Sequence, residues 1–214
     1  MTNFGQARAH MVDNQLRTSG VNDWRILNLM GAIAREDFVA ASRKSTAYVD
    51  DVQWLDGAAP GRFIAPPATF AKLLQLADIA ADETVLEIGA GTGYSTAVIA
   101  GLARTVVGYE ADTALAEAAT QNLATLGVSN ASIIARLSNA QFDVVFVEGT
   151  LGAIPPEFFA AMKDGGRLIA LVQTGGVGVA HVFVKTGTTV TSRIEFNASL
   201  PPLLTTRAVE EFVF

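Results

Sequence analysis

Three glycines separate a short apolar run from a helical segment in the stretch VLEIGAGTGYSTAVIA. Gly89, Gly91 and Gly93 allow a tight turn and a close approach of backbone N–H groups to a ligand. Residues 84–88 are predicted to form a buried strand and residues 94–103 a helix. The turn would therefore lie at the carboxyl edge of a sheet, where α/β proteins bind nucleotides and nucleosides.

Two glutamates near this turn indicate which ligand it binds. Glu110 ends the next predicted strand and follows Gly89 by 21 residues, a spacing at which a carboxylate accepts the hydroxyls of a ribose. Glu87 lies two residues before Gly89, where it would repel a pyrophosphate but attract a cation. S-adenosylmethionine carries a sulfonium and an ammonium and no phosphate, so charge favours it over a nicotinamide dinucleotide, whose G-x-G-x-x-G spacing is missing. The alternatives are a glycine turn that only packs tightly and glutamates that only cap strand ends.

The composition excludes several other kinds of chemistry. The 214 residues include no cysteine, which rules out disulfides, a thiol nucleophile and cysteine-ligated metals. His10 and His181 are too few for a histidine metal site, and both are expected to pack or to lie at the surface. The net charge of −6 disfavours nucleic acid as a partner, and no apolar run reaches the roughly 20 residues of a membrane span. We expect a cytoplasmic protein without a metal.

The elements that must position these residues alternate along the chain. Apolar strands separated by helices predict an α/β fold with a doubly wound, Rossmann-like sheet that is mostly parallel and covered on both faces. A short link between the last two strands predicts an antiparallel edge. The expected strands are 84–88, 105–110, 131–135, 142–148, 167–173, 179–186 and 189–196, and the expected helices are 67–79, 94–103, 112–126 and 155–163.

The first part of the chain has a different pattern. Helical spacing is expected within 4–18 and 24–34, followed by an irregular connection or short strands over 36–66. We therefore expect a helical and substrate-side extension, 1–66, packed on a core, 67–214, as one compact unit. Trp24 and Trp54 are expected to be packing residues, with Trp24 on the same helix face as Leu27.

Five stretches resemble the protein-L-isoaspartate O-methyltransferase family, one of the class I S-adenosylmethionine-dependent methyltransferases. They follow the order and spacing of that family and lie at 11–39, 47–50, 61–79, 85–100 and 154–172. The resemblance implies a doubly wound sheet that binds S-adenosylmethionine and releases S-adenosylhomocysteine. It implies methylation of the free carboxylate of isoaspartyl residues in damaged polypeptides, which starts their repair. An ionised carboxylate attacking a sulfonium needs alignment and desolvation rather than a general base.

The resemblance also implies roles for single residues. The residues expected to hold the methionine part of the cofactor are Glu87, Gly89, Ala90, Gly91 and Gly93. Glu110 would hold the ribose, and Tyr94 either contacts the cofactor or only packs. The substrate-side loop over the reacting centre, which would act by positioning alone, consists of Ile64, Ala65, Pro66 and Pro67.

Two departures from the family pattern leave the activity open. Ala65 stands where the family has a serine or threonine, so a hydrogen bond to the acceptor worth roughly 1 kcal/mol is lost. The stretch 133–143 is shortened and lacks the family's Gly-Asp-Gly loop at the adenine, for which Ser138 or Asn139 is a candidate replacement. The alternatives are a weak or silent family member that binds a ligand or partner, and a methyltransferase for another small acceptor. Arg35 is expected in a structural ion pair, or as a carboxylate clamp.

Overall fold

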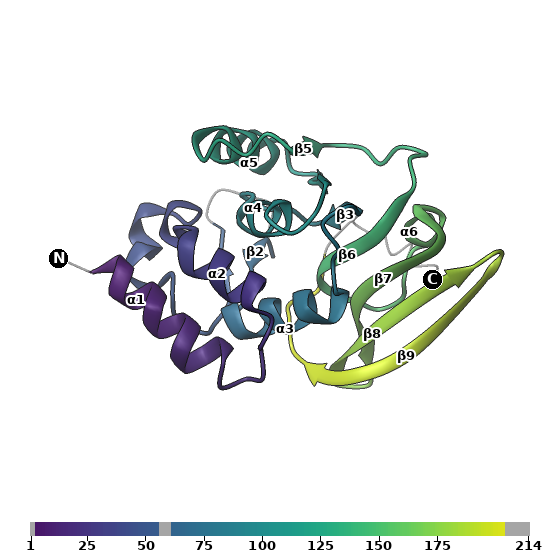
Figure 1. Ribbon diagram of the computed structural model, residues 1–214, viewed down its shortest axis with the longest axis horizontal. Coiled ribbons are helices and arrows are strands. Elements are labelled where there is room, and N and C mark those ends of the chain that lie inside the picture. Colours follow the sequence, from purple (N-terminus) through teal and green to yellow (C-terminus); the bar gives the residue numbers. More distant parts are fainter. Residues whose placement is uncertain (1–2, 56–60, 204–214) are drawn as a thin grey trace, which may run out of the picture.

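The computed structural model describes residues 3–55 and 61–203, and its centre is a seven-stranded sheet with the strand order β5-β4-β3-β6-β7-β8-β9 (Figure 1). The strands are β3 (Thr84–Ile88), β4 (Thr105–Tyr109), β5 (Ala131–Ile134), β6 (Phe142–Leu151), β7 (Met162–Thr174), β8 (Val177–Thr186) and β9 (Thr189–Ala198). The first five are mutually parallel, β8 runs antiparallel to β7, and β9 runs antiparallel to β8. The mostly parallel sheet with an antiparallel edge is confirmed.

The helices begin and end at residues whose chemistry suits those positions. Asp23 caps α2 by accepting from the N–H of Arg25 at 2.8 Å, and Asp112 caps α5 by accepting from the N–H of Leu115 at 3.1 Å. Gly127 follows α5 with a φ of 69°, a left-handed conformation suited to glycine. The helices are α1 (Phe4–Met11), α2 (Trp24–Ala32), α3 (Pro67–Ala77), α4 (Tyr94–Ala100), α5 (Thr113–Thr125) and α6 (Pro156–Ala160), with a π-helical turn at Val12–Leu16 and 3₁₀ turns at Arg35–Asp37 and Ala41–Thr46.

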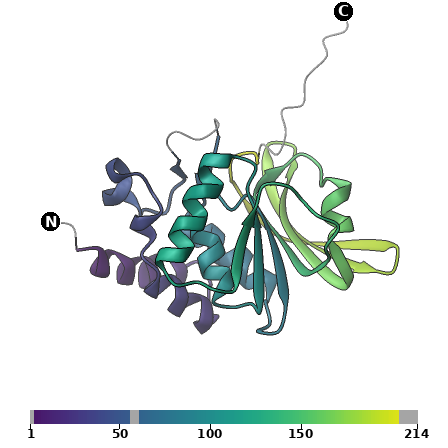
Figure 2. The ribbon, with the colours of Figure 1, turned by 90° about the horizontal axis from the view of Figure 1, so that it is seen from above.

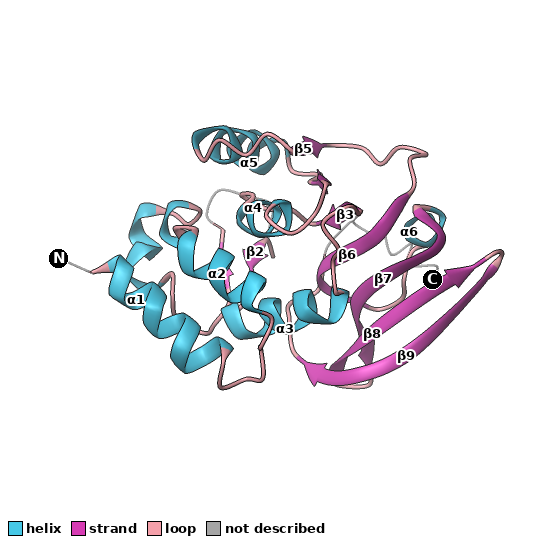
Figure 3. Ribbon diagram, viewed as in Figure 1, coloured by secondary structure: helices cyan, strands magenta, loops and turns pink. Residues whose placement is uncertain are grey.

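Apolar side chains pack against both faces of the sheet, because successive residues of a strand point to opposite sides. Val85 and Phe146 belong to the larger cluster, which also includes side chains of α2, α3 and α4. Leu86 and Val145 belong to the smaller cluster, which includes Phe158 of α6. Figure 3 shows α1 and α2 towards one end of the molecule and the long strands β7, β8 and β9 towards the other, where α6 also lies.

The amino-terminal segment lies against the side of the sheet that carries α3 and α4 (Figure 2). Its buried side chains join the larger cluster, so the packing is continuous across the expected boundary at residue 66. The two-strand ribbon of β1 (Gln53–Trp54) and β2 (Phe63–Ile64) connects this segment to α3. The division into an extension and a core stays a prediction.

Two expectations from the sequence need correction. The helix expected over 155–163 ends at Ala160, and the residues after it already belong to β7. The register of β6 and β7 shifts there: Phe142 pairs with Met162 and Val144 with Arg167, which leaves residues 163–166 in an irregularity of the strand. Trp24 is 69 % exposed, since it is the first residue of α2 and faces away from the core.

Within the described residues, no helix is long and apolar enough to cross a membrane.

Candidate active site

The glycine turn connects β3 to α4 at the carboxyl edge of the sheet. Gly89, Gly91 and Gly93 have φ values of 93°, 56° and 90°, which other residues rarely adopt. A Cβ atom on Gly93 would also lie 3.2 Å from the backbone of Ala119 in α5. Glycine at these positions therefore allows both the turn and the close packing of α5 behind it.

Glu110 is buried directly beside this turn. Its Oε2 accepts the N–H of Gly91 at 2.8 Å, and its Oε1 accepts the N–H of Asp112 at 3.0 Å. The Tyr109 carbonyl accepts the N–H groups of Gly89 and Ala90, which fastens the turn to the end of β4. The structure thus brings Glu110 and the glycines together, as the sequence predicted.

Arg62 is the third component at this edge, and the sequence reasoning did not single it out. Its guanidinium donates to Oε2 of Glu110 in a buried ion pair. The residue directly precedes β2, so the substrate-side loop and the predicted ribose carboxylate are linked through one side chain. No local pattern could have identified Arg62, because its partner Glu110 lies 48 residues further along the chain.

Two more acids lie deeper in the same place. Glu87 is fully buried on β3 and accepts the hydroxyl of Thr96 at 2.5 Å. Burial raises the pKa of Glu87 to about 7, and the negative charge of Glu110 adds to the effect. Glu148 on β6 is also buried. Burial raises the pKa of its carboxyl well above the usual value, and the negative charge of Glu87 raises it further. The positive charge of Arg35 opposes this rise. Sequence reasoning missed Glu148, although it ends the predicted strand 142–148 as Glu110 ends 105–110.

Arg35 holds the substrate-side loop from below. It is completely buried and donates to the carbonyls of Ala47 and Ala65, both at 2.7 Å. Its guanidinium lies 4.8 Å from the centre of the Tyr94 ring, which packs edge-on against Phe38. The hydrogen bonds of Arg35 therefore go to backbone carbonyls rather than to the acids beside it in AREDF, and Tyr94 faces this packed cluster.

The substrate-side loop lies against the glycine turn. Ile64 and Ala65 are buried, Pro66 precedes α3, and Pro67 is its first residue, where a missing N–H costs nothing. The carbonyl of the neighbouring Phe63 lies 3.8 Å from the place where a Cβ on Gly91 would stand. The residue before the loop therefore lies beside the glycine turn, and a place of the four loop residues over the reacting centre stays a prediction.

A segment near the carboxyl end of the described chain closes the site. A Cβ on Gly89 would lie 2.9 Å from Cδ1 of Leu203, so this leucine sits directly on the glycine turn. The segment is anchored to β6, because the N–H of Leu203 donates to the Thr150 carbonyl at 2.9 Å and the N–H of Thr150 donates to the Pro201 carbonyl at 3.0 Å. The cavity that remains between Arg62, the turn and Leu203 measures only ≈ 10 Å³. The short apolar run SLPPLL has no periodicity that could have identified this role.

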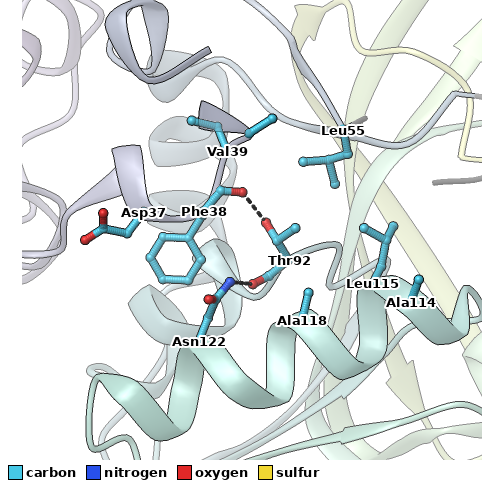
Figure 4. A pocket seen from close by; sticks show the side chains of 10 residues that line it. Asp37, Phe38, Val39, Leu55, Thr92, Ala114, Leu115, Ala118 and Asn122 are labelled. Carbon is cyan, nitrogen blue, oxygen red and sulfur yellow. Dashed lines mark hydrogen bonds between the residues drawn. The ribbon is translucent and has the colours of Figure 1, made fainter. Parts of the chain in front are cut away.

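A larger pocket of ≈ 270 Å³ lies next to the turn, bordered by Val39, Leu55 and α5 (Figure 4). The hydroxyl of Thr92 donates to the Phe38 carbonyl at 2.7 Å, and the side-chain amide of Asn122 donates to the Thr92 carbonyl at 2.9 Å. These two bonds fasten the amino-terminal segment and α5 to the glycine turn. The pocket therefore has walls from three parts of the chain.

The connection between β5 and β6 contains Ser138 and Asn139, which line a hollow against α6 with Glu157. A contact of either residue with an adenine stays a prediction. Over residues 3–55 and 61–203, no group of three or more histidine or acidic side chains is placed to hold a metal ion.

The fold and this edge define the class. A mostly parallel sheet, a glycine turn after β3 and a buried acid after β4 are the arrangement of α/β methyltransferases that use S-adenosylmethionine. The chain belongs to the protein-L-isoaspartate(D-aspartate) O-methyltransferase family, whose model matches residues 6–204.

Curated relatives agree with this assignment, and solved structures agree with the fold. The chain is 37 % identical over 191 residues to the protein-L-isoaspartate O-methyltransferase of Koribacter versatilis, covering 86 % of this chain and 85 % of the relative. It is 37 % identical over 175 residues to that of Brucella anthropi, covering 79 % of each. Among solved structures, a protein-L-isoaspartate O-methyltransferase matches with a TM-score of 0.79 at 24 % identity, covering 92 % of this chain and 65 % of that one. A candidate enzyme of this kind from Plasmodium falciparum, solved with S-adenosyl-L-homocysteine, matches with a TM-score of 0.77 at 18 % identity, covering 95 % and 99 %.

Proposed function

We propose that this protein transfers a methyl group from S-adenosylmethionine to the free carboxylate of isoaspartyl residues in polypeptides. The observation that carries the proposal is Glu110, which is buried at the carboxyl edge, held by two backbone N–H groups and placed against the glycine turn. Membership in the family supports both the cofactor and the substrate class. A cytoplasmic location stays a prediction from the sequence.

The residues present suit this cofactor. Among the described residues, Oε1 of Glu87 and Oε1 of Glu148 have no hydrogen-bond partner although both side chains are buried, which favours a ligand with positive charge. We assign the methionine part to the edge formed by Glu87 and the glycines, and the ribose to Glu110. Arg62 and Leu203 must move aside for that ligand, because they now cover Glu110 and Gly89.

Bound S-adenosylmethionine supplies a methyl group on a good leaving group. The acceptor carboxylate is already ionised at neutral pH, so its oxygen forms the new bond to carbon as the carbon–sulfur bond breaks, and no side chain has to remove a proton. The chain aligns the reactants and excludes water from them. Arg35 fixes the carbonyl of Ala65, and the buried loop keeps water away from the edge. The scarcity of histidine and the lack of cysteine are consistent with this chemistry.

Two measurements test the proposal. Calorimetry with S-adenosylhomocysteine should give binding that E110Q weakens about tenfold or more, because a charged acceptor of two ribose hydroxyls is lost. Transfer of labelled methyl to an isoaspartyl peptide should exceed transfer to the matched aspartyl peptide. Binding without this preference would point to another acceptor, and no binding at millimolar ligand would remove the enzyme proposal.

A second candidate function is a family member that does not bind the cofactor and acts through its surface. The observation in its favour is the closed edge, where Arg62 and Leu203 leave a cavity of only ≈ 10 Å³. The same calorimetric titration separates the two candidates.

A further inference from the structure

Glu87 and Glu148 lie side by side on neighbouring parallel strands. Glu87 on β3 pairs in register with Phe146 on β6, so Glu148 lies two residues further towards the carboxyl edge. Side chains two residues apart on a strand share one face, and both acids therefore point to the side covered by α4. There Glu87 accepts from Thr96, and Ser95 lies close enough to Glu148 to lower its pKa.

This pair also reaches the glycine turn. A Cβ on Gly89 would stand 3.5 Å from Cβ of Glu148, which places the base of that side chain against the first glycine. The Oε1 atoms of Glu87 and Glu148 have no hydrogen-bond partner within residues 3–55 and 61–203. Buried carboxylate oxygens without partners are unfavourable unless a ligand supplies the missing interaction.

The charges around the pair leave room for a cation. Three buried acids, Glu87, Glu110 and Glu148, lie near two buried bases, Arg35 and Arg62. Arg62 is paired with Glu110, and the hydrogen bonds of Arg35 go to two carbonyls. When all five groups are ionised, the cluster carries a single excess negative charge. S-adenosylmethionine carries a sulfonium, an ammonium and one carboxylate, so its single net positive charge matches this excess.

We propose that Glu148 joins Glu87 in binding the positively charged methionyl end of S-adenosylmethionine. This inference rests on the proposed function, and it adds a residue for which the sequence had predicted no role. Glu148 is a binding residue in this view and takes no part in moving protons during methyl transfer.

This role predicts a second measurable effect, the release of protons when the ligand binds. Burial raises the pKa of Glu148 well above its usual value and that of Glu87 to about 7. Glu87 faces Glu148 and raises the pKa of Glu148 further. Arg35, Arg62 and Ser95 lower the pKa of Glu148. Tyr94 also lies within range of the charge of Glu148. A cation that binds beside the two acids favours their ionised forms, so binding should release protons at neutral pH.

The experiment compares three ligands on the full-length chain. S-adenosylmethionine has both positive groups, S-adenosylhomocysteine has only the ammonium, and 5′-methylthioadenosine has neither. In E148Q, the first two should bind about tenfold more weakly, whereas 5′-methylthioadenosine should bind within about twofold of the wild type. Glu117, an exposed residue of α5, provides the matched control E117Q, which should leave all three affinities unchanged.

Calorimetry in two buffers of different ionisation enthalpy measures the protons released, and E148Q should release fewer of them than the wild type. Gln keeps the size of Glu148, and E148D is a second variant that should bind S-adenosylmethionine better than E148Q does. An equal loss for all three ligands, or no loss for any, would overturn the inference while cofactor binding itself persists. Failure of the wild type to bind any of the three would overturn the proposed function and this inference with it.

Discussion

The guanidinium of Arg62 is held by the carboxylate of Glu110, 48 residues further along the chain. This carboxylate is the group we assign to the ribose, so Arg62 and the ligand compete for one acceptor. Cofactor binding must therefore break a buried ion pair before it gains its own hydrogen bonds.

R62A should increase affinity for adenosine and for S-adenosylhomocysteine by the same factor, about fivefold to tenfold, because the competing group acts on the ribose that both ligands share. Calorimetry measures both constants. R104A removes an exposed arginine of the same charge and should change neither of them. Weaker adenosine binding in R62A would mean that the arginine contacts the nucleoside instead of competing with it.

The stability of the protein should fall as the pH rises through neutrality, and Glu87 is one cause. Burial raises the pKa of Glu87 from 4.5 to about 7. The unfolded chain thus loses its proton first, and the stability present below about pH 4.5 declines until the folded group ionises at about pH 7. The shift corresponds to a decline on the order of 3 kcal/mol.

Urea unfolding between about pH 5 and pH 8 checks this prediction, with E87Q as the reference that lacks the Glu87 carboxyl but keeps every other titratable group. The wild type should lose stability relative to E87Q over that range. Glu148, whose pKa is raised in the same direction, remains in both proteins. A difference that stays constant over this range would show that Glu87 is already ionised in the folded protein at pH 5.

Ala65 offers a simple gain-of-function test. A65S restores a hydroxyl to the substrate-side loop and should raise methyl transfer to an isoaspartyl peptide about fivefold, the equivalent of one hydrogen bond. The steady-state rate constant kcat/KM on isoaspartyl and aspartyl peptides measures the effect. An unchanged or lower value would argue that this side chain faces away from the acceptor.

R35M should cost about 3 kcal/mol of unfolding free energy, because the buried carbonyls of Ala47 and Ala65 lose their charged donors. Denaturant unfolding gives this number. R17A removes an exposed arginine that pairs with Asp13 and should change stability by no more than about 0.5 kcal/mol. If R35M is as stable as R17A, then Arg35 does not hold the loop in the way we describe.

The sequence predicted those parts of the molecule that depend on local pattern. Strand β3, the glycine turn and the cap of α5 follow from apolar runs, from glycine and from Asp112, and each was placed within a few residues. Glu110 was found because its distance from Gly89 is set by one strand–helix–strand unit.

The remaining parts depend on contacts between distant segments. Arg62 meets Glu110 and Leu203 meets Gly89 only after the chain has folded, and no spacing within the sequence connects them. Trp24 was expected to pack with Leu27 on one face of the helix, but its place at the start of α2 leaves it exposed. The end of α6 was missed because a pattern that suits a helix continued into the irregular start of β7.

The position of Leu203 on Gly89 has a consequence for biosynthesis. A nascent chain can form β3, the turn and β4 long before the ribosome reaches the segment that covers them. Residues 200–203 are made after all these parts, so the binding edge can form before the segment that bonds to Thr150 covers it. Before that contact forms, S-adenosylmethionine could reach the glycine turn without displacing Leu203.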